Sequence, residues 1–166
     1  MVQIRIAPLM ALALPAALSA QAAAAPQEPH VIVAHAATLT WKAGPPSLPA
    51  GAQIAVIEGH PADSAPFTFR LKLPANYRIP PHSHGGIEHV TVIAGTLNVG
   101  MGDQATYMNG AVLKQGSMGV IPPQTVHYAW TGAGGVTIQL HGIGPWTIMY
   151  VNAADDPRNK KPVGSQ

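Results

Sequence analysis

The sequence contains no cysteine among its 166 residues. This absence excludes a disulfide framework, a zinc site built on thiolates, an iron–sulfur cluster and a cysteine nucleophile. Any metal ion must therefore be held by nitrogen and oxygen atoms. The eight histidines become the residues of interest, because histidine is the commonest metal ligand in proteins.

Charged side chains are also scarce, at 10% of all residues with a formal net charge of +2. Together with a hydrophobic share of 47%, this excludes a disordered polyelectrolyte. The lysines and arginines are too few and too scattered to predict a nucleic-acid partner. The 17 glycines and 17 prolines disfavour long helices and favour short strands joined by tight turns.

The N-terminus has the layout of a secretory signal peptide, which we assign to residues 1–22. Arg5 precedes an apolar stretch over residues 6–18, and small residues follow, so we expect cleavage between residues 22 and 25. A membrane anchor is the competing interpretation. The stretch is shorter than the ~20 residues that a spanning helix needs, and Pro8 and Pro15 interrupt it. We therefore expect a protein of the periplasm or the medium, with no stable membrane anchor after cleavage.

The rest of the chain predicts an all-β domain. We expect a proline-rich lead-in over 26–52, with one edge strand at His30–Val33, then a barrel over 53–151 and a polar tail over 152–166. Short apolar or alternating runs recur between turn signals, which is typical of a sandwich or barrel. The predicted strands of the barrel are 54–57, 67–73, 89–99, 119–121, 126–130, 136–141 and 146–151.

The segment from Pro80 to His89 carries the candidate chemistry. In an extended strand, residues two apart point to the same side, so His82 and His84 present two imidazoles together. A bend at Gly85-Gly86 lets Glu88, which opens the next strand, return to the same point. His89 has the opposite parity and is not expected to be a metal ligand.

The fourth candidate ligand is His127. It follows a turn containing Pro122 and Pro123, and prolines restrict the backbone of such a turn. Three imidazoles and one carboxylate suit one divalent transition-metal ion, with Fe or Mn favoured and Zn, Ni or Cu as alternatives. Ca²⁺ and Mg²⁺ are disfavoured because they prefer all-oxygen shells.

At these residues the chain resembles the cupins, a family of small double-stranded β-helices, or jelly-roll barrels. The first cupin motif has Gly, five residues, His-x-His, three or four residues, Glu, six residues and Gly. The residues that match it are His82, His84, Glu88 and Gly95, with Asn76 in place of the leading Gly. Because Asn tolerates a left-handed backbone, Asn76 is expected to occupy a turn.

The second cupin motif has Gly, five residues, Pro-x-Gly, two residues, His, three residues and Asn. Its matches are Gly116, Pro122 and His127, whereas Gln124 stands for the Gly and Thr131 for the Asn. The resemblance covers roughly residues 50–150 and implies a jelly-roll barrel with a metal held by His82, His84, Glu88 and His127. More narrowly, the chain resembles small exported bacterial cupins with one domain. Because dimers are common in the family that it resembles, we expect a homodimer.

Two further polar residues are candidates for contacts to a metal ligand or to a substrate. Gln139 and His141 alternate along a predicted strand, opposite the apolar row of Ile138 and Leu140. Period-two alternation separates the two faces but does not say which one is inside. They could therefore face the barrel cavity or lie on an exposed side of the sheet.

Three functions fit this set of residues. The first is a metal-dependent oxidoreductase of the dioxygenase type, which acts on a small molecule and needs no catalytic residue beyond the metal ligands. The second is a non-catalytic metal-binding or sensing module, and the third is a metal-dependent isomerase or decarboxylase. Whether the chain is an enzyme stays open at this stage.

Overall fold

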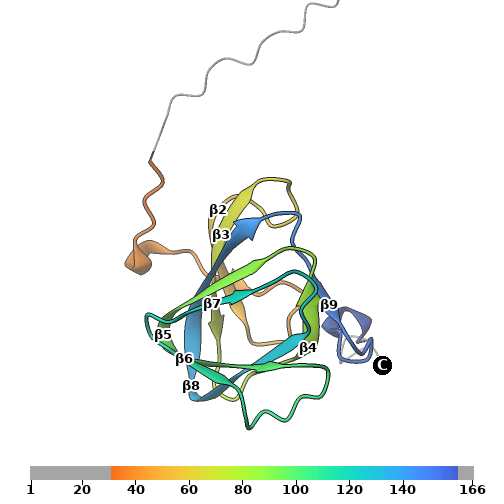
Figure 1. The fold of residues 1–166 in the computed structure, drawn as a ribbon. Coiled ribbons are helices and arrows are strands. Elements are labelled where there is room, and N and C mark those ends of the chain that lie inside the picture. The colour runs from red at the N-terminus through yellow and green to blue at the C-terminus, as the bar shows by residue number, and fades with distance from the viewer. Residues whose placement is uncertain (1–30, 161–166) are drawn as a thin grey trace, which may run out of the picture. The chain divides into compact units, whose positions relative to one another are not determined.

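The computed structural model describes residues 31–160, which contain nine strands and two short 3-10 helices (Figure 1). The predicted signal peptide, His30 and the last residues of the predicted tail lie outside this range. Among the described residues, no helix is long and apolar enough to cross a bilayer. The elements are η1 (Ala36–Thr38), β1 (Lys42–Ala43), β2 (Gln53–Glu58), β3 (Pro66–Leu73), β4 (Arg78–His84), β5 (Glu88–Met101), β6 (Ala111–Lys114), β7 (Met118–Ile121), β8 (His127–Ile143), β9 (Ile148–Tyr150) and η2 (Pro157–Asn159).

All the strands belong to one antiparallel sheet that curls around a common interior (Figure 1). The long strand β8 organises it. Along one edge, the second half of β8 pairs with β3 and its first half pairs with β4. Along the other edge β5 follows β8 over nearly its whole length and also pairs with β6 and β7. The pair of long strands β5 and β8 therefore joins β3 and β4 on one side to β6 and β7 on the other.

Glycines allow the two long paired strands, β5 and β8, to bend at the same place. Gly95 in β5 and Gly135 in β8 have positive φ angles of 83° and 66°, which residues with a side chain adopt only at a cost. A Cβ atom at Gly95 would lie 2.5 Å from the carbonyl oxygen of Gly135. The register of β5 against β8 shifts on both sides of this point, as β-bulges do when they increase the bend of a strand.

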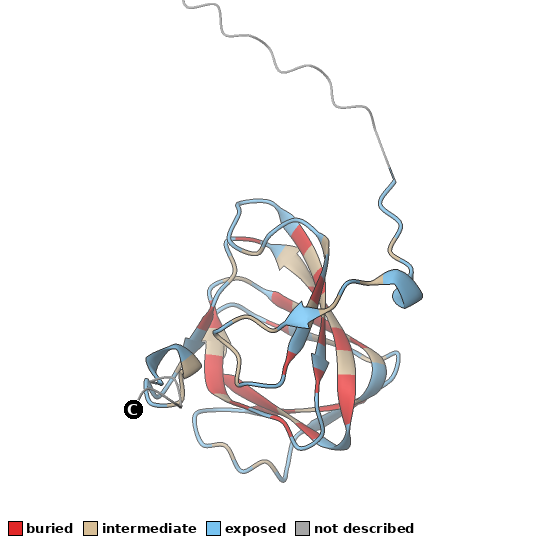
Figure 2. Ribbon diagram, turned by 180° about the vertical axis from the view of Figure 1, so that it is seen from behind, coloured by how far each residue is buried: buried red, intermediate tan, exposed pale blue. Residues whose placement is uncertain are grey.

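The interior is apolar because the strands alternate. In β3 the residues Phe67, Phe69, Leu71 and Leu73 are buried, whereas the residues between them are partly or fully exposed. Figure 2 shows the same alternation of buried and exposed bands along the strands. Buried side chains from β4, β5, β8 and β9 complete a single hydrophobic cluster.

The structure confirms the all-β prediction and changes its details. The runs 126–130 and 136–141 form one strand, β8, because the glycines at 132–135 bend the strand without ending it. Of the run predicted at His30–Val33, the described residues Val31–Val33 lie in no strand, and the edge position is taken by β1. The short strand β6 was not predicted, because its four residues do not alternate between buried and exposed positions.

Replacing Gly135 with alanine tests the bend. We expect Gly135→Ala to lower the free energy of unfolding by at least about 2 kcal/mol, since a left-handed residue with a Cβ costs about 1–2 kcal/mol. In addition, the new Cβ would lie 2.6 Å from the Leu73 carbonyl oxygen. Gly134→Ala is the matched control: nothing lies within 4 Å of its Cβ position, so we expect a change within about 0.5 kcal/mol. Urea denaturation of both variants measures the difference, and equal stabilities would contradict this account of the bend.

Candidate metal centre

Three histidines meet at the start of β8 and the end of β4. His82 and His84 point to the same side of β4, and His82 is paired in register with His127 of β8. One ring nitrogen from each histidine lies within 4.8 Å of the others. All three side chains are buried, with 3%, 4% and 2% of their surface exposed. The pairing of the strands thus brings together residues that lie far apart in the sequence.

Local backbone features place the rings. The register between β4 and β8 shifts between Ile79 and His82, where Pro80 and Pro81 lie. A turn precedes His127, and Gln124 in this turn has a φ of 59°. The Gln124 amide donates a hydrogen bond of 2.7 Å to the His84 carbonyl oxygen. This bond fastens the turn that carries His127 to the strand that carries the other two rings.

Hydrogen bonds to the backbone determine the tautomer of each ring. The Nδ1 atoms of His82, His84 and His127 lie 2.7, 2.8 and 3.0 Å from carbonyl oxygens, which belong to Pro80, Thr147 and Thr125. A carbonyl oxygen can only accept, so each Nδ1 carries the proton. In the neutral rings every Nε2 then offers a lone pair, as in the metal sites where a second hydrogen bond orients the histidine.

Glu88 completes the group from the first residue of β5. Its Oε2 atom lies 3.2 Å from Nε2 of His84 and 3.2 Å from Nε2 of His127. The Oε2 atom and the His84 Nε2 atom are buried without a hydrogen-bond partner. Two atoms bound at right angles to one ion, each at ~2.1 Å, would lie about 3.0 Å apart. The separations of Glu88 from His84 and His127 and the buried lone pairs are therefore compatible with a cation beside the group of three histidines.

The charges of the site agree with this fit. Burial, together with the neighbouring His127 and His84 rings, lowers the pKa of His82 to about 3, so this ring is neutral at ordinary pH. Burial alone would raise the pKa of Glu88, but its contacts with His127 and His84 outweigh burial and hold that pKa well below its ordinary range. A neutral His82 and an ionised Glu88 are the forms in which these two side chains bind a metal ion.

The four residues line a cavity of about 70 Å³ in the interior of the barrel. The other lining residues come from β3, β4, β5, β7, β8 and β9 and from residues 45–48 of the lead-in, and nearly all are apolar. Apart from the three histidines and Glu88, the lining contains no titratable side chain. No separate acid or base is thus available in the cavity.

The segment between β8 and β9 contributes contacts that the sequence did not predict. The Trp146 ring stacks on the His84 ring with centroids 4.1 Å apart and an angle of 15°, and Thr147 supplies the carbonyl that accepts from the same histidine. Trp146 also packs against Phe67 and Phe69. The Gly-Pro-Trp run was visible in the sequence, but no pattern related it to His84.

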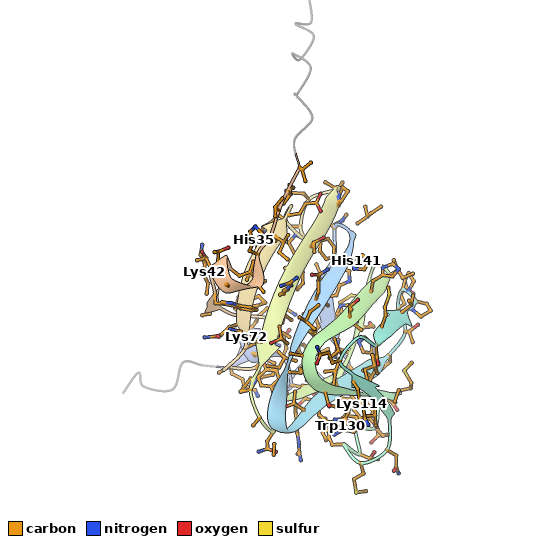
Figure 3. The ribbon with its side chains drawn as sticks, turned by 90° about the vertical axis from the view of Figure 1, so that its left-hand side faces the viewer. His35, Lys42, Lys72, Lys114, Trp130 and His141 are labelled. Carbon is orange, nitrogen blue, oxygen red and sulfur yellow. The ribbon has the colours of Figure 1, made fainter. Side chains whose placement is uncertain are left out.

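Gln139 and His141 lie on the outer face of the sheet and do not line the cavity. Gln139 accepts a hydrogen bond of 3.1 Å from Nε of Arg70 on β3. The His141 ring stacks on the His89 ring, with centroids 4.8 Å apart. Figure 3 shows His141 toward one end of β8 and Trp130 toward the other. The inward residues of this part of β8 are Ile138 and Leu140.

Comparisons with known proteins agree with the expected cupin barrel. A family model described as the ChrR cupin-like domain matches residues 29–141. No curated protein matches the chain. Many solved structures share the fold, and three of them show how widely the resemblance extends.

Each of the three resembles this chain along most of its length. The polyketide cyclase RemF from Streptomyces resistomycificus has 15% sequence identity and a TM-score of 0.61, with 78% of this chain and 91% of that chain covered. A candidate acetylacetone dioxygenase from Methylibium petroleiphilum has 15% identity and a TM-score of 0.58, with 80% and 88% covered. An RmlC-like cupin from Shewanella frigidimarina has 13% identity and a TM-score of 0.52, with 68% and 90% covered. These similarities show the fold.

The low pKa of His82 predicts that the metal-free protein loses stability in acid. The unfolded chain protonates this histidine below about pH 6.5, whereas the folded chain resists protonation down to about pH 3. Stability from this group is therefore complete above pH 6.5 and is lost as the pH falls toward 3. Urea denaturation in the presence of a chelator measures this dependence. His82→Leu should show a shallower slope over the same range, and an equal slope would contradict the assignment.

Proposed function

This chain belongs to the family of ChrR cupin-like domains, and from that premise and its buried histidine cluster we propose that it binds one divalent transition-metal ion through His82, His84, Glu88 and His127. We further propose that the bound ion makes it an oxidoreductase of the dioxygenase type that acts on a small molecule. Fe and Mn are favoured, because these ions readily accept ligands beyond the four that the chain supplies.

One observation carries the proposal. Each of the three rings donates its Nδ1 proton to a backbone carbonyl, so three Nε2 lone pairs and one carboxylate converge in a buried place. Without a cation, these groups would be an uncompensated cluster of acceptors, and buried polar groups without partners are costly. A histidine cluster that only stabilised the fold would gain no stability from placing three Nε2 lone pairs beside a carboxylate.

The chain itself supplies positioning and the exclusion of water. An ion in this site would act as a Lewis acid that orients a substrate and, where it is redox-active, exchanges electrons with it. The apolar lining keeps bulk water from the reacting groups, which strengthens electrostatic interactions there. Because the lining offers no further acid or base, reactions that need a separate protein base are disfavoured relative to oxidation at the metal.

Metal analysis of the purified protein tests the proposal. We expect about one equivalent of Fe or Mn per chain by mass spectrometry, and a loss of most of it in His127→Ala, because a removed ligand weakens metal sites strongly. The matched control is His141→Ala, which removes a histidine from the outer face and should leave the metal content unchanged. A metal content that is equal in both variants would refute the site.

Oxygen consumption tests the reaction class. The metal-loaded protein should consume oxygen with a small chelating substrate, and His127→Ala should not. A metal-loaded protein that binds such molecules without consuming oxygen would contradict the oxidoreductase while leaving the metal site intact.

A further inference from the structure

The charge of the proposed site restricts what can bind beside the ion. Histidine binds a metal ion through its neutral ring, and glutamate binds one through its ionised carboxylate. The Nδ1 contacts of His82, His84 and His127 to backbone carbonyls leave the Nε2 atoms of these rings for the ion. A divalent cation held by three such rings and one carboxylate therefore leaves one net positive charge. Among the lining residues there is no second carboxylate and no lysine or arginine. An uncompensated charge in apolar surroundings is unfavourable. A substrate with a single negative charge neutralises the site, whereas a dianion would leave a negative charge buried with no cationic side chain beside it.

The lining restricts the rest of the substrate. Apart from the metal ligands, only Ser47 and the Trp146 indole carry polar side-chain atoms, and the other lining residues are apolar. Val90, Leu97, Val99, Ile121, Ile138 and Leu140 contribute to the surface around the ligands. A hydroxyl group on the body of a substrate would lose its water here and find few partners, which costs free energy.

One wall of the cavity is a strap from the lead-in, which we define as residues 45–49. Pro45, Ser47 and Leu48 of this strap line the cavity. Two tyrosines hold it: the Tyr150 hydroxyl donates a hydrogen bond of 2.8 Å to the Ser47 carbonyl oxygen, and the Tyr77 hydroxyl donates one to the Pro49 carbonyl oxygen. Burial raises the pKa of both hydroxyls, so they remain donors at ordinary pH.

The volume with the strap in place limits the size of the substrate. The cavity of about 70 Å³ is smaller than the ~150 Å³ apolar cavity that accommodates benzene, and far below the ~300 Å³ lower bound of sites for drug-sized molecules. With the strap closed, the cavity therefore restricts the substrate to a small molecule.

We propose that the substrate is a small monoanionic molecule that chelates the ion through two oxygen atoms and has an apolar body, the class to which short-chain 2-hydroxy acids belong. The inference rests on the proposed metal site. It excludes sugar acids, whose bodies carry hydroxyl groups, and dicarboxylates, which carry a second charge. The anionic end lies at the ion, and the apolar end lies among the aliphatic side chains of β5 and β8.

The test uses probes with the same chelating end. 2-Hydroxybutyrate and glycerate differ only in that a methyl group of the first is a hydroxyl group in the second, and tartronate adds a second carboxylate. Titration calorimetry of the zinc-loaded protein should give 2-hydroxybutyrate an affinity about tenfold to a hundredfold higher than that of glycerate, the range by which apolar pockets reject an added hydroxyl. Tartronate should bind no better than glycerate.

Two pairs of variants separate the lining from the strap. Val90→Thr adds a hydroxyl to the lining at nearly constant volume and should reduce the preference for 2-hydroxybutyrate, whereas Val112→Thr, on the exposed side of β6, should not. Tyr150→Phe releases the strap at Ser47 and should improve binding of the bulkier 2-hydroxy-4-methylpentanoate. Tyr107→Phe is its control, because that ring packs against Arg78, Tyr128 and Trp130 and is not among the residues that line the cavity.

Metal content is measured before each titration. A chain that takes up no zinc would refute the proposed function and this inference with it. A zinc-loaded chain that binds glycerate or tartronate as tightly as 2-hydroxybutyrate, or binds none of the probes, would refute the substrate class alone. Retained zinc in Val90→Thr and Tyr150→Phe shows that the variants have folded around an intact site.

Discussion

The candidate metal centre depends on the hydrogen bonds that each histidine ring makes away from the cavity. In His82 and His127 the Nδ1 atom bonds to the carbonyl two residues earlier in the chain, so the acceptor that orients each ring is local. In His84 the acceptor is Thr147, which lies far along the chain. The third ring is therefore oriented only when the segment between β8 and β9 has folded against β4, and the complete site requires the complete barrel.

Two turns with a left-handed backbone hold the strands that carry these rings. Asn76 and Gln124 have φ angles of 55° and 59°, and both stand where the cupin motifs have glycine. The free-energy cost of this left-handed conformation is modest for Asn and higher for Gln. Each turn is tied to a strand: the Asn76 amide bonds to Gly132 of β8, and the Gln124 amide bonds to His84 of β4. Departures from the motif therefore keep the backbone shape that glycine would have provided.

Three of the four candidate ligands, His82, His84 and Glu88, could be predicted from the sequence by short-range rules, whereas His127 was predicted from the turn before it and from the second cupin motif. Alternation along a strand pairs His82 with His84, and the parity of β5 separates Glu88 from His89. What could not be predicted depends on contacts between distant segments. The three glycines between residues 132 and 135 are compatible with a turn between two strands or with a bend within one strand. The pairing of β8 with both β3 and β4 shows that one bent strand is formed. Packing between distant segments also determines that Gln139 lies on the outer face of the sheet. The same kind of packing brings Trp146 into contact with His84.

Part of the lead-in, which was predicted to lie outside the barrel, contributes to the lining of the cavity. The proline-rich composition predicts a lead-in that lies outside the barrel. In the structure, however, Pro45, Ser47 and Leu48 of the strap line the cavity. Proline has no amide proton, so Pro45, Pro46 and Pro49 present no donor that would need a partner beside an apolar space. Of the two remaining residues, Leu48 donates to the Pro45 carbonyl within the strap. The proline-rich composition of the lead-in is thus also one that suits a cover, and the lining of the cavity includes residues upstream of β2.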